Sequence, residues 1–323
     1  MWLISLVAIV VHFAKASTYY GPPPSSQKFS KVYIVDDFAD TKPEFVNMKA
    51  AIEAADYIAF DNELGGFINN KAGFNDTPEQ YYRKLADTVE KYSLLQFGFT
   101  TVKRNGDVYE EQAWSIYVKD DIVTCNPSSA EFLCKAGFDW SKLFQKGMSM
   151  TKLSEFIRGT LFPAKKPLVC HNCLGDVLHL LKYFSSHGVP QDLVQFSSAA
   201  ESTFVFYDTK VMFMEYKPET SNADSNLSAC YQHFNGPFVG PAHGAGVDSL
   251  MTGRVFAYLL EKKSLADYAP LRNSLMLDSS RYYNLVSNKI NIFPRISVPH
   301  NRHNSREWNN QQPQPRTPRT ASD

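Results

Sequence analysis

The sequence of 323 residues lacks an excess of charge of either sign, because 33 Lys and Arg residues are balanced by 33 Asp and Glu residues. A neutral chain has no overall electrostatic field that would attract nucleic acid or an anionic membrane surface. This argues against avid, non-specific coating of nucleic acid. Binding of nucleic acid in one local groove stays open, since a few basic side chains and metal ions can supply the attraction there.

Charged residues make up 20% of the chain, which is too few for a disordered protein. The chain is also too long to be a small scaffold that depends on disulfides or metals. At ~100 to 200 residues per domain, the length allows one large domain or two ordinary ones. With 44% hydrophobic and 14% aromatic residues there is ample material for a packed core. The sequence therefore predicts a globular protein.

A nearly continuous apolar run begins the chain, over residues 1–13, and it is followed by Ala14-Lys15-Ala16. An A-x-A end is typical of a signal-peptidase site. The run is shorter than the ~20 residues that a membrane-spanning helix needs. We therefore expect a cleaved signal peptide over residues 1–16 and a secreted protein. An uncleaved anchor in the endoplasmic reticulum membrane and a buried helix are the alternatives, and the missing basic residues before the run weaken the signal interpretation.

Cysteines are few and odd in number, five in all, so at least one would stay free or pair with another chain. Cys170 and Cys173 form a single CxxC with no second pair, and a zinc site is therefore disfavoured. The sequons that begin at Asn75 and Asn226 would matter only in a secreted protein.

Composition divides the rest of the chain into three parts. Residues 17–30 are rich in Pro and Ser and predict a linker. Residues 31–299 carry the periodic apolar patterns of a folded domain. Residues 300–323 consist mainly of Asn, Gln, Pro, Arg and Ser, which predicts a disordered, mildly basic tail, with a weak RNA-holding arm as the alternative.

Within the domain, the apolar periods predict alternating strands and helices. Asn105-Gly106 between two apolar runs predicts an antiparallel hairpin, and Asp76-Thr77-Pro78-Glu79 predicts the start of a helix that runs through Val89. Strands are expected at 32–35, 57–61, 94–102, 112–118, 168–169 and 203–207, and helices at 43–55, 128–137, 140–146, 151–161, 176–185, 193–195, 226–233 and 246–259. This pattern predicts an α/β fold with a mixed β-sheet flanked by helices.

Two carboxylates follow an apolar run at Ala59-Phe60-Asp61-Asn62-Glu63. In a strand, residues two apart point to the same face, so Asp61 and Glu63 lie side by side. Two like charges so close together are unfavourable without a cation between them. Taken alone, a polar strand end is nevertheless a commoner explanation than a metal site.

Two more acidic residues stand where helices begin. Asp176 lies in the first turns of the helix that follows the Leu168-Val169 strand, and His243 precedes Asp248 by five residues in a Gly-containing entry to another helix. Alone, Asp176 is explained by the helix dipole and His243 by an exposed loop. Together, four carboxylates and one histidine are sufficient for a hydrolase that uses two metal ions.

In this order, Asp-x-Glu, His-Asn-x-x-x-Asp and His-x-Ala-Gly-x-Asp resemble the motifs of the DEDDh class of 3′-to-5′ exonucleases, and among them the poly(A)-specific ribonuclease (PARN) family. The similarity spans about residues 31–291. Other stretches that agree are Ala51–Asp56, Asp76–Glu79, Leu95–Gly98, Gly137–Asp139, Asp208–Lys210 and Leu250–Gly253. The resemblance implies an RNase H-like fold and a metal-dependent 3′-to-5′ exoribonuclease, with poly(A) as a candidate substrate.

The sequence departs from the PARN pattern in two places. Phe138 and His171 lie too close together to hold the accessory single-strand-binding domain of that family, and no RNA-recognition domain follows the core. We therefore expect only the nuclease domain, over residues 31–299, as in PARN-like domain-containing proteins. The family's His-Glu-Ala-Gly is His243-Gly244-Ala245-Gly246 here, which keeps the histidine.

Hard oxygen ligands favour hard cations, so we expect Asp61, Glu63, Asp176 and Asp248 to hold two Mg2+ ions, with Mn2+ as a substitute. His243, with an ordinary pKa of ~6.5, would accept a proton from the attacking water. The product would be a 5′-mononucleotide. A catalytically silent, secreted RNA-binding or interaction protein with the same fold is the alternative.

The resemblance also implies contacts with single-stranded RNA that has a free 3′ end. Phe67 and Phe132 would offer surfaces for stacking, Asn172 would orient a base or sugar, and Lys210 would neutralise a phosphate. A core position for Phe132 and a solvated charge for Lys210 remain equally open. Family members commonly self-associate, which makes a homodimer a further expectation.

Overall fold

The described part of the computed structural model comprises residues 31–39, 42–67, 76–106, 108–217, 225–237, 239–240, 243–277, 281–287 and 289–292. The expected signal peptide, linker and tail (1–16, 17–30 and 300–323) lie outside these residues, as does the sequon residue Asn75. Among the described residues, no helix has the length and apolar character needed to cross a membrane.

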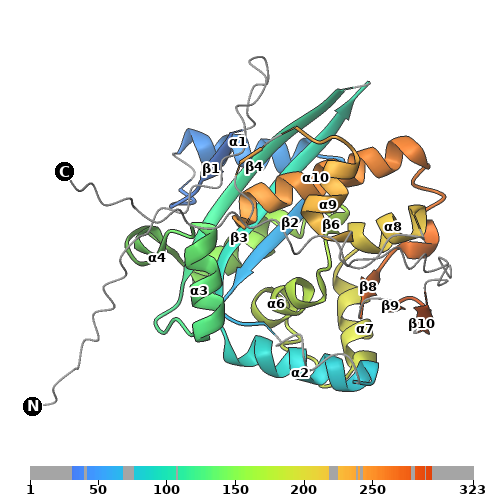
Figure 1. Cartoon of the computed structure of the whole chain (residues 1–323). Coiled ribbons are helices and arrows are strands. Elements are labelled where there is room, and N and C mark those ends of the chain that lie inside the picture. Colours follow the sequence, from blue (N-terminus) through green and yellow to red (C-terminus); the bar gives the residue numbers. More distant parts are fainter. Residues whose placement is uncertain are drawn as a thin grey trace, which may run out of the picture.

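A seven-stranded sheet runs through the centre of the molecule (Figure 1) in the order β1-β4-β3-β2-β6-β7, with β5 paired to β4. The pairs β2–β3 and β3–β4 are antiparallel and the other pairs are parallel, so the sheet is mixed. The strands are β1 (Val32–Ile34), β2 (Tyr57–Leu64), β3 (Leu94–Asn105), β4 (Val108–Lys119), β5 (Met148–Ser149), β6 (Leu168–Cys170) and β7 (Phe206–Asp208). The predicted α/β class with a mixed sheet is confirmed.

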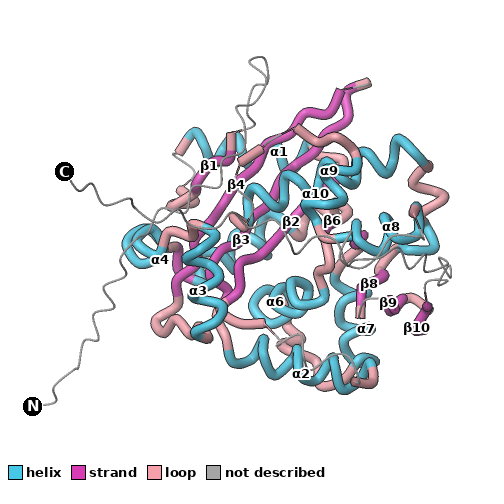
Figure 2. Tube along the Cα trace, viewed as in Figure 1, coloured by secondary structure: helices cyan, strands magenta, loops and turns pink. Residues whose placement is uncertain are grey.

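Helices cover both faces of this sheet (Figure 2). They are α1 (Pro43–Ala54), α2 (Pro78–Lys91), α3 (Pro127–Ala136), α4 (Trp140–Lys146), α5 (Met150–Phe156) with the short π-helix η2 (Ile157–Leu161), α6 (Leu174–Phe184), α7 (Leu193–Thr203), α8 (Thr209–Tyr216), α9 (Leu227–His233) and α10 (Ala245–Lys262). A 3-10 turn, η4 (Ala269–Leu271), leads to a small antiparallel sheet of β8 (Ser274–Met276), β9 (Arg281–Asn284) and β10 (Lys289–Ile292).

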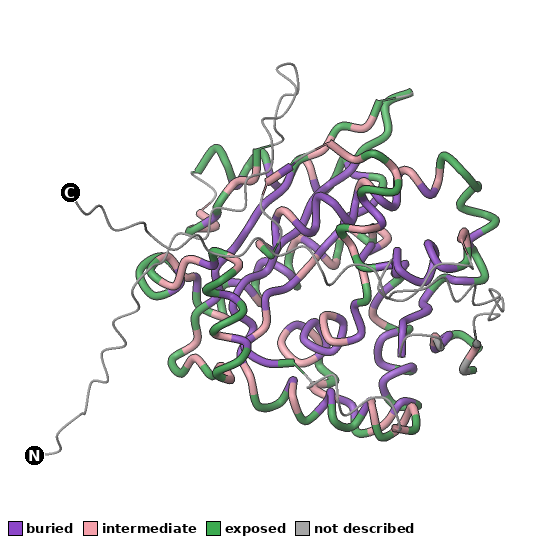
Figure 3. The backbone as a smooth tube through the Cα atoms, in the orientation of Figure 1, coloured by how far each residue is buried: buried purple, intermediate pink, exposed green. Residues whose placement is uncertain are grey.

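Strand β2 is buried on both faces (Figure 3), and its residues alternate between two hydrophobic cores. Ile58 and Phe60 pack in the core that α1, α2, α6 and α7 cover. Tyr57 and Ala59 pack in the core that α8, α9 and α10 cover. Because successive strand residues point to opposite faces, the odd-numbered residues of β2 face α10 and the even-numbered ones face α6.

Local signals in the sequence account for many of the element ends. Thr77 caps α2 in a capping box with Gln80, with Pro78 in the first turn. Helix α3 ends at Gly137, whose φ of 86° lies in the left-handed region that glycine adopts without strain. The hairpin around Gly106 is confirmed, although its strands are longer than expected.

Two expectations about the elements were wrong, and two features were missed. Helix α7 extends from residue 193 to Thr203, well past residue 195, and β7 begins only at Phe206. The extension was missed because small residues such as Ser197, Ala199 and Ala200 pack in the interior without giving a strong apolar period. Helix α8 and the small sheet β8–β10 were not expected, because these segments are short and have no clear amphipathic pattern.

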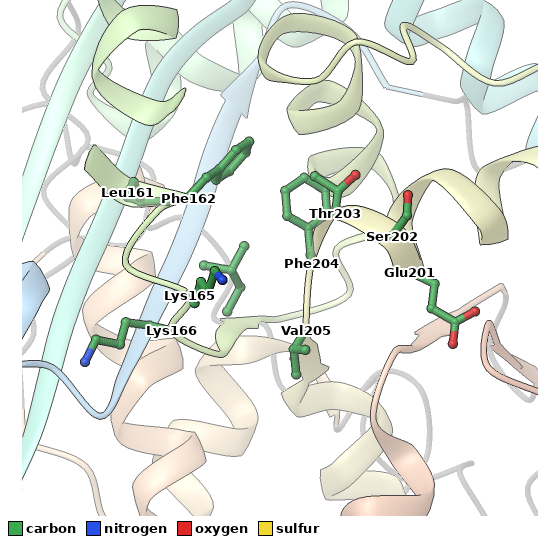
Figure 4. Close-up of a pocket in the computed structure, with 10 residues that line it drawn as sticks. Leu161, Phe162, Lys165, Lys166, Glu201, Ser202, Thr203, Phe204 and Val205 are labelled. Carbon is green, nitrogen blue, oxygen red and sulfur yellow. The ribbon is translucent and has the colours of Figure 1, made fainter. Parts of the chain in front are cut away.

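A cavity of about 280 Å³ lies where β6 and β7 begin (Figure 4), beside the end of η2 and the end of α7. Phe162 and Lys165 line one side of it, and Thr203, Phe204 and Val205 line the other. Glu201 is the only acidic residue among those that line it, so the cavity offers no set of metal ligands. None of the four predicted acidic site residues, Asp61, Glu63, Asp176 and Asp248, lines this cavity.

Candidate active site

Asp61 and Glu63 lie near the carboxyl end of β2, on the face that α10 covers. Ala59 faces α10, and residues two apart in a strand point to the same face. Asp61 and Glu63 follow Ala59 at this spacing, so both carboxylates also point toward α10. Glu63 is 7% exposed, and Asp61 is partly buried. The strand therefore carries two neighbouring carboxylates into the interior of the protein, as the Asp-x-Glu spacing predicts.

The start of α10 is held against the sheet by side chains of β3 and β4. Gly244 precedes the helix and has no side chain to cap it, and Gln96 Oε1 instead accepts the Ala245 N–H at 2.8 Å. The Gly246 N–H donates to Ser115 Oγ at 3.0 Å. A Cβ atom at Gly98 would lie only 2.0 Å from the Ala245 carbonyl carbon, so this approach requires glycine.

This docking brings Asp248, in the first turn of α10, beside the carboxylates of β2. One oxygen from each of Asp61, Glu63 and Asp248 lies within 4.8 Å of the others. Asp248 Oδ2 accepts the His243 backbone N–H at 3.1 Å, and Asp248 Oδ1 is buried with no hydrogen-bond partner in the described part of the chain. Clustered carboxylate oxygens, one of them unpartnered, are ligands that fit a divalent cation.

The raised pKa values of the clustered carboxylates also indicate a site for a cation. Burial, together with the charges of Asp248 and Asp176, raises the pKa of Glu63 to about 8. Burial and the charges of Asp176, Asp248 and Glu63 raise the pKa of Asp61 well above its ordinary value. Burial also raises the pKa of Asp248 to about 6. Several buried carboxylates therefore cannot ionise together at neutral pH unless a cation compensates their charge.

Asp176 approaches the cluster from the other face of the sheet. It lies in the first turn of α6, whose apolar residues pack in the core opposite α10. Its oxygens are not within the 4.8 Å group of Asp61, Glu63 and Asp248, yet its charge raises the pKa of both Asp61 and Glu63. Burial raises the pKa of Asp176 itself to about 7. The four predicted carboxylates are thus neighbours, and oxygens of three of them lie within 4.8 Å of one another.

His243 lies at the edge of this cluster, next to an aromatic pair. Its backbone is left-handed, with φ of 68°, and burial lowers the pKa of its imidazole. The ring packs edge-on against Phe132 with a centroid distance of 4.8 Å, and Phe132 packs against Phe67 at 6.3 Å. Phe132 and Phe67 are 41% and 48% exposed. Phe132 is therefore not a core residue, and both aromatic rings lie on the surface beside the site.

Asn172 and Lys210 lie where β6 and β7 end. Asn172 is exposed, with a left-handed φ of 56°, and its backbone N–H donates to Asp208 Oδ1 at 2.9 Å. Lys210 is 7% exposed, so it is not a solvated surface charge. Burial lowers the pKa of the Lys210 amine, and the nearby carboxylate of Asp208 acts against that shift.

Comparison with known proteins identifies the family to which this chain belongs. A model of the CAF1 family ribonuclease matches residues 37–156 and 150–256, which is more than half of the chain. The chain belongs to the CAF1 ribonuclease family. This DEDD-type nuclease family includes PARN and the CCR4-associated factor homologues, so the resemblance to PARN in the motifs is confirmed.

Two relatives of this family match at about 30% identity. "Probable CCR4-associated factor 1 homolog 1" of Arabidopsis thaliana is 31% identical over 225 residues, 67% of this chain and 61% of the relative. "Poly(A)-specific ribonuclease PARN" of Xenopus laevis is 32% identical over 129 residues, 35% of this chain and 20% of the relative. The matched segment thus spans less than two thirds of either relative.

A solved CAF1-family structure has the same fold. Pop2p of S. pombe, in its Mg2+- and Mn2+-bound form, aligns with a TM-score of 0.65 and 21% identity, over 77% of this chain and 100% of that one. At this identity the match establishes the RNase H-like fold alone. The expectation of Mg2+ or Mn2+ is supported, because this neighbour binds both ions and the present chain has an acidic cluster that could bind them.

The prediction of a secreted or membrane-anchored protein was wrong. The CAF1-family relatives that this chain matches, CCR4-associated factor 1 homologues and PARN, are cytoplasmic deadenylase components. The prediction failed because it depended on a short A-x-A pattern after one apolar run, and such a pattern arises easily by chance. The expected homodimer also finds no support, and residues of one chain assemble the whole carboxylate cluster.

Three functional positions of this CAF1-family chain were missed in the sequence. Gln96 and Ser115 lie in strands that were predicted, but their role in capping α10 depends on strand order. Asp208 was noted only within the stretch Asp208–Lys210 that resembles PARN, whereas it is a buried carboxylate that accepts three backbone N–H groups. A polar residue in an otherwise apolar strand was the available signal for each of them.

Cys170 and Cys173, which bracket the His-Asn motif, are joined as a disulfide in this structure. Cys125, Cys134 and Cys230 are unpaired.

Proposed function

We propose that this CAF1-family chain is a metal-dependent 3′-to-5′ exoribonuclease, formed by one nuclease domain over residues 31–299, that shortens single-stranded RNA from a free 3′ end and releases 5′-mononucleotides. Poly(A) is its candidate substrate. The observation that carries the proposal is the cluster of Asp61, Glu63 and Asp248, whose carboxylate oxygens lie within 4.8 Å of one another, with an unpartnered buried oxygen on Asp248 and with His243 next to it.

The four carboxylates would hold two divalent cations, Mg2+ or Mn2+. When bound, these ions would supply an activated water nucleophile and stabilise the charge that develops on the leaving 3′ oxygen. Asp61 and Glu63 are fixed by β2, and Asp248 is fixed by α10, which Gln96 and Ser115 dock against the sheet. Rigid elements therefore set the positions of the ligands before any ion or substrate arrives.

His243 is the base in this proposal. Because burial lowers the pKa of its imidazole, the ring is neutral at pH 7 and can accept a proton from the attacking water. The edge-on contact with Phe132 and the hydrogen bond from its backbone N–H to Asp248 hold the residue in place. The same hydrogen bond ties the position of the base to that of a metal ligand.

The exposed rings of Phe67 and Phe132 would stack on bases or pack on sugars near the 3′ end, since aromatic platforms bind single strands with little regard to sequence. Asn172 projects from the turn before α6 and would orient a base or sugar. Lys210 would offset phosphate charge from its position beside Asp208. These residues do not specify a preference for adenine, so the nucleotide specificity has to be measured in the assay.

The function is tested with 5′-labelled oligo(A) and 5′-labelled RNA of mixed sequence, each with a 3′-hydroxyl or a 3′-phosphate. We expect a ladder that shortens from the 3′ end in Mg2+, no products in EDTA, and slow degradation of the blocked 3′-phosphate RNA. The ratio of the two rates on the 3′-hydroxyl RNAs measures the preference for adenine. Folded protein that cleaves neither RNA with any divalent cation would contradict the proposal and favour a silent RNA-binding protein.

His243→Asn is expected to lower kcat by about 100- to 10,000-fold, the usual contribution of a general base. Asn is the suitable replacement because it tolerates the left-handed φ of 68° at this position and has no titrating group. The wild-type rate should fall on the acid side as His243 becomes protonated, below pH 6.5, and the variant should lose this acid limb. An unchanged pH–rate profile in the variant would exclude His243 as the base.

A further inference from the structure

The turn between β6 and α6 is held by a residue from a neighbouring strand. Cys173, at the N-cap of α6, makes no capping hydrogen bond with its own side chain. The side chain of Asp208, the last residue of β7, supplies the capping hydrogen bonds instead. Its Oδ1 accepts the N–H of Asn172 at 2.9 Å, and its Oδ2 accepts the N–H of Cys173 at 3.3 Å. The start of α6 is therefore capped from outside its own segment.

The same carboxylate also caps the N-terminus of the next helix, α8. Asp208 Oδ1 accepts the N–H of Lys210 at 2.9 Å and so caps α8. The side chain of His171 adds a second tie, because its Nδ1 lies 2.9 Å from Thr209 Oγ1 and its Nε2 donates to the Ser225 carbonyl at 3.1 Å. Residues 208 and 209 thus fix both halves of the turn that precedes Asp176.

Burial sets Asp208 apart from the other acidic helix caps. It is 1% exposed, and burial raises the pKa of its carboxyl against the effect of the three N–H donors. Asp192 and Asp139, the N-caps of α7 and α4, are only partly buried. Placing a carboxylate in the interior is costly, and capping α8 alone would not require it, since Ser or Thr also caps helices.

We propose that Asp208 is a positioning residue of the metal site, which holds the left-handed Asn172 and the first turn of α6 so that Asp176 stays next to Asp61 and Glu63. This inference rests on the proposed function. Asp176 is the one ligand that comes from the far face of the sheet, and it is not within the group of three carboxylates whose oxygens lie within 4.8 Å of one another. Its position therefore depends on the turn, which the Cys170–Cys173 disulfide closes and which Asp208 ties to β7 through the N–H groups of Asn172 and Cys173.

The test compares Asp208→Ser with Asp192→Ser. Serine can still cap α8 through the Lys210 N–H, but it is too short to reach the N–H groups of Asn172 and Cys173. Asp192→Ser is the matched control, because Asp192 is also an acidic N-cap, it accepts the Gln195 N–H at 2.8 Å, and it belongs to α7 rather than to the site. The readouts are Mn2+ affinity of the EDTA-treated protein by calorimetry, thermal melting, and kcat on oligo(A).

We expect Asp208→Ser to bind Mn2+ about 10- to 100-fold more weakly, the usual effect of removing a group that orients a metal ligand. Its kcat should fall in parallel, whereas Asp192→Ser should keep the wild-type values for both. If Asp208→Ser does not fold, Asp208→Asn replaces it. The amide oxygen of Asn can keep the bonds to Asn172 and Lys210, but its amide nitrogen would face the Cys173 N–H.

The outcomes separate this inference from the proposed function. Wild-type Mn2+ affinity and kcat in folded Asp208→Ser or Asp208→Asn would overturn the inference alone. A wild-type protein that binds no Mn2+ would overturn the proposed function, and the inference with it. A loss in thermal stability with unchanged Mn2+ affinity would assign Asp208 a purely structural role and would also overturn the inference.

Discussion

Asp61→Asn is expected to lower the ribonuclease rate at least ~1000-fold, equivalent to about 4 kcal/mol of transition-state stabilisation, and to raise the melting temperature of the metal-free protein. The rate falls because Asn keeps the shape of Asp61 but removes a charged ligand from the centre of the cluster. The stability rises because burial, together with the charges of Asp176, Asp248 and Glu63, disfavours the ionised Asp61 carboxylate. Opposite effects on activity and stability are typical of a functional charge cluster.

The two effects are measured as kcat on oligo(A) in Mg2+ and as the thermal midpoint in EDTA. At about 2 to 4 °C per kcal/mol for a domain of this size, a rise of a few degrees is expected. Asp192→Asn is the matched control, since Asn and Asp cap helices equally well and Asp192 lies at the start of α7. It should change neither quantity. Activity within ten-fold of wild type, or a lower midpoint in Asp61→Asn, would show that Asp61 has another role.

The second large effect concerns pH. In the metal-free protein, we expect stability to fall as the pH rises from 6.5 to 8. The pKa values of Glu63 and Asp176 are raised to about 8 and about 7 in the folded protein. Over this range the folded state still holds protons that the unfolded chain has already released, so a rise in pH favours unfolding. Above about pH 9 these two groups are ionised in both states, and the decline should level off.

Buried histidines limit the useful range to pH 6.5 and above. Burial lowers the pKa of His171 to about 3 and that of His179 to about 4, so both are neutral in the folded protein. Below pH 6.5 their unfolded forms bind protons that the folded forms do not, and stability therefore rises with pH there. The two trends oppose each other between pH 4 and 6.5, whereas between pH 6.5 and 8 the contribution of the histidines fades and that of the carboxylates dominates.

The measurement is a set of thermal melts in EDTA and in Mg2+ across this range. A cation that binds the folded state at 100 times its Kd adds about 2.7 kcal/mol. It also favours the ionised carboxylates, so Mg2+ should raise the midpoint and remove most of its decline between pH 6.5 and 8. Asp61→Asn should show a weaker decline in EDTA. A midpoint that is independent of pH in EDTA, or one that Mg2+ leaves unchanged, would contradict a clustered metal site.

The sequence was sufficient to predict the parts of the site that lie on one element. The period of two along β2 placed Asp61 and Glu63 on one face, and the turn at Asn105-Gly106 gave the hairpin that pairs with β2. The five-residue spacing of His243 and Asp248 was consistent with a loop that enters a helix, and the structure joins the two by a hydrogen bond. These features depend on local geometry, which a sequence encodes directly.

Features that depend on strand order could not be predicted in this way. Helices α6 and α10 cover opposite faces of the sheet, so Asp176 and Asp248 reach the end of β2 from different sides. This arrangement follows only from the strand order β3-β2-β6. The capping of α10 by Gln96 links residues 149 positions apart. The hydrogen bond from the Asn172 N–H to Asp208 likewise requires β6 and β7 to be neighbouring strands.

The most direct test of the metal-dependent nuclease is the release of 5′-AMP from 3′-hydroxyl oligo(A) by EDTA-treated protein, followed by chromatography while Mg2+ is added back. Wild type should release no nucleotide before the addition and should release 5′-AMP steadily after it, whereas Asp61→Asn should stay at least ~1000-fold slower at every Mg2+ concentration. Nucleotide release that continues in EDTA, or that is equally fast in Asp61→Asn, would contradict the assignment of the carboxylate cluster as the catalytic centre.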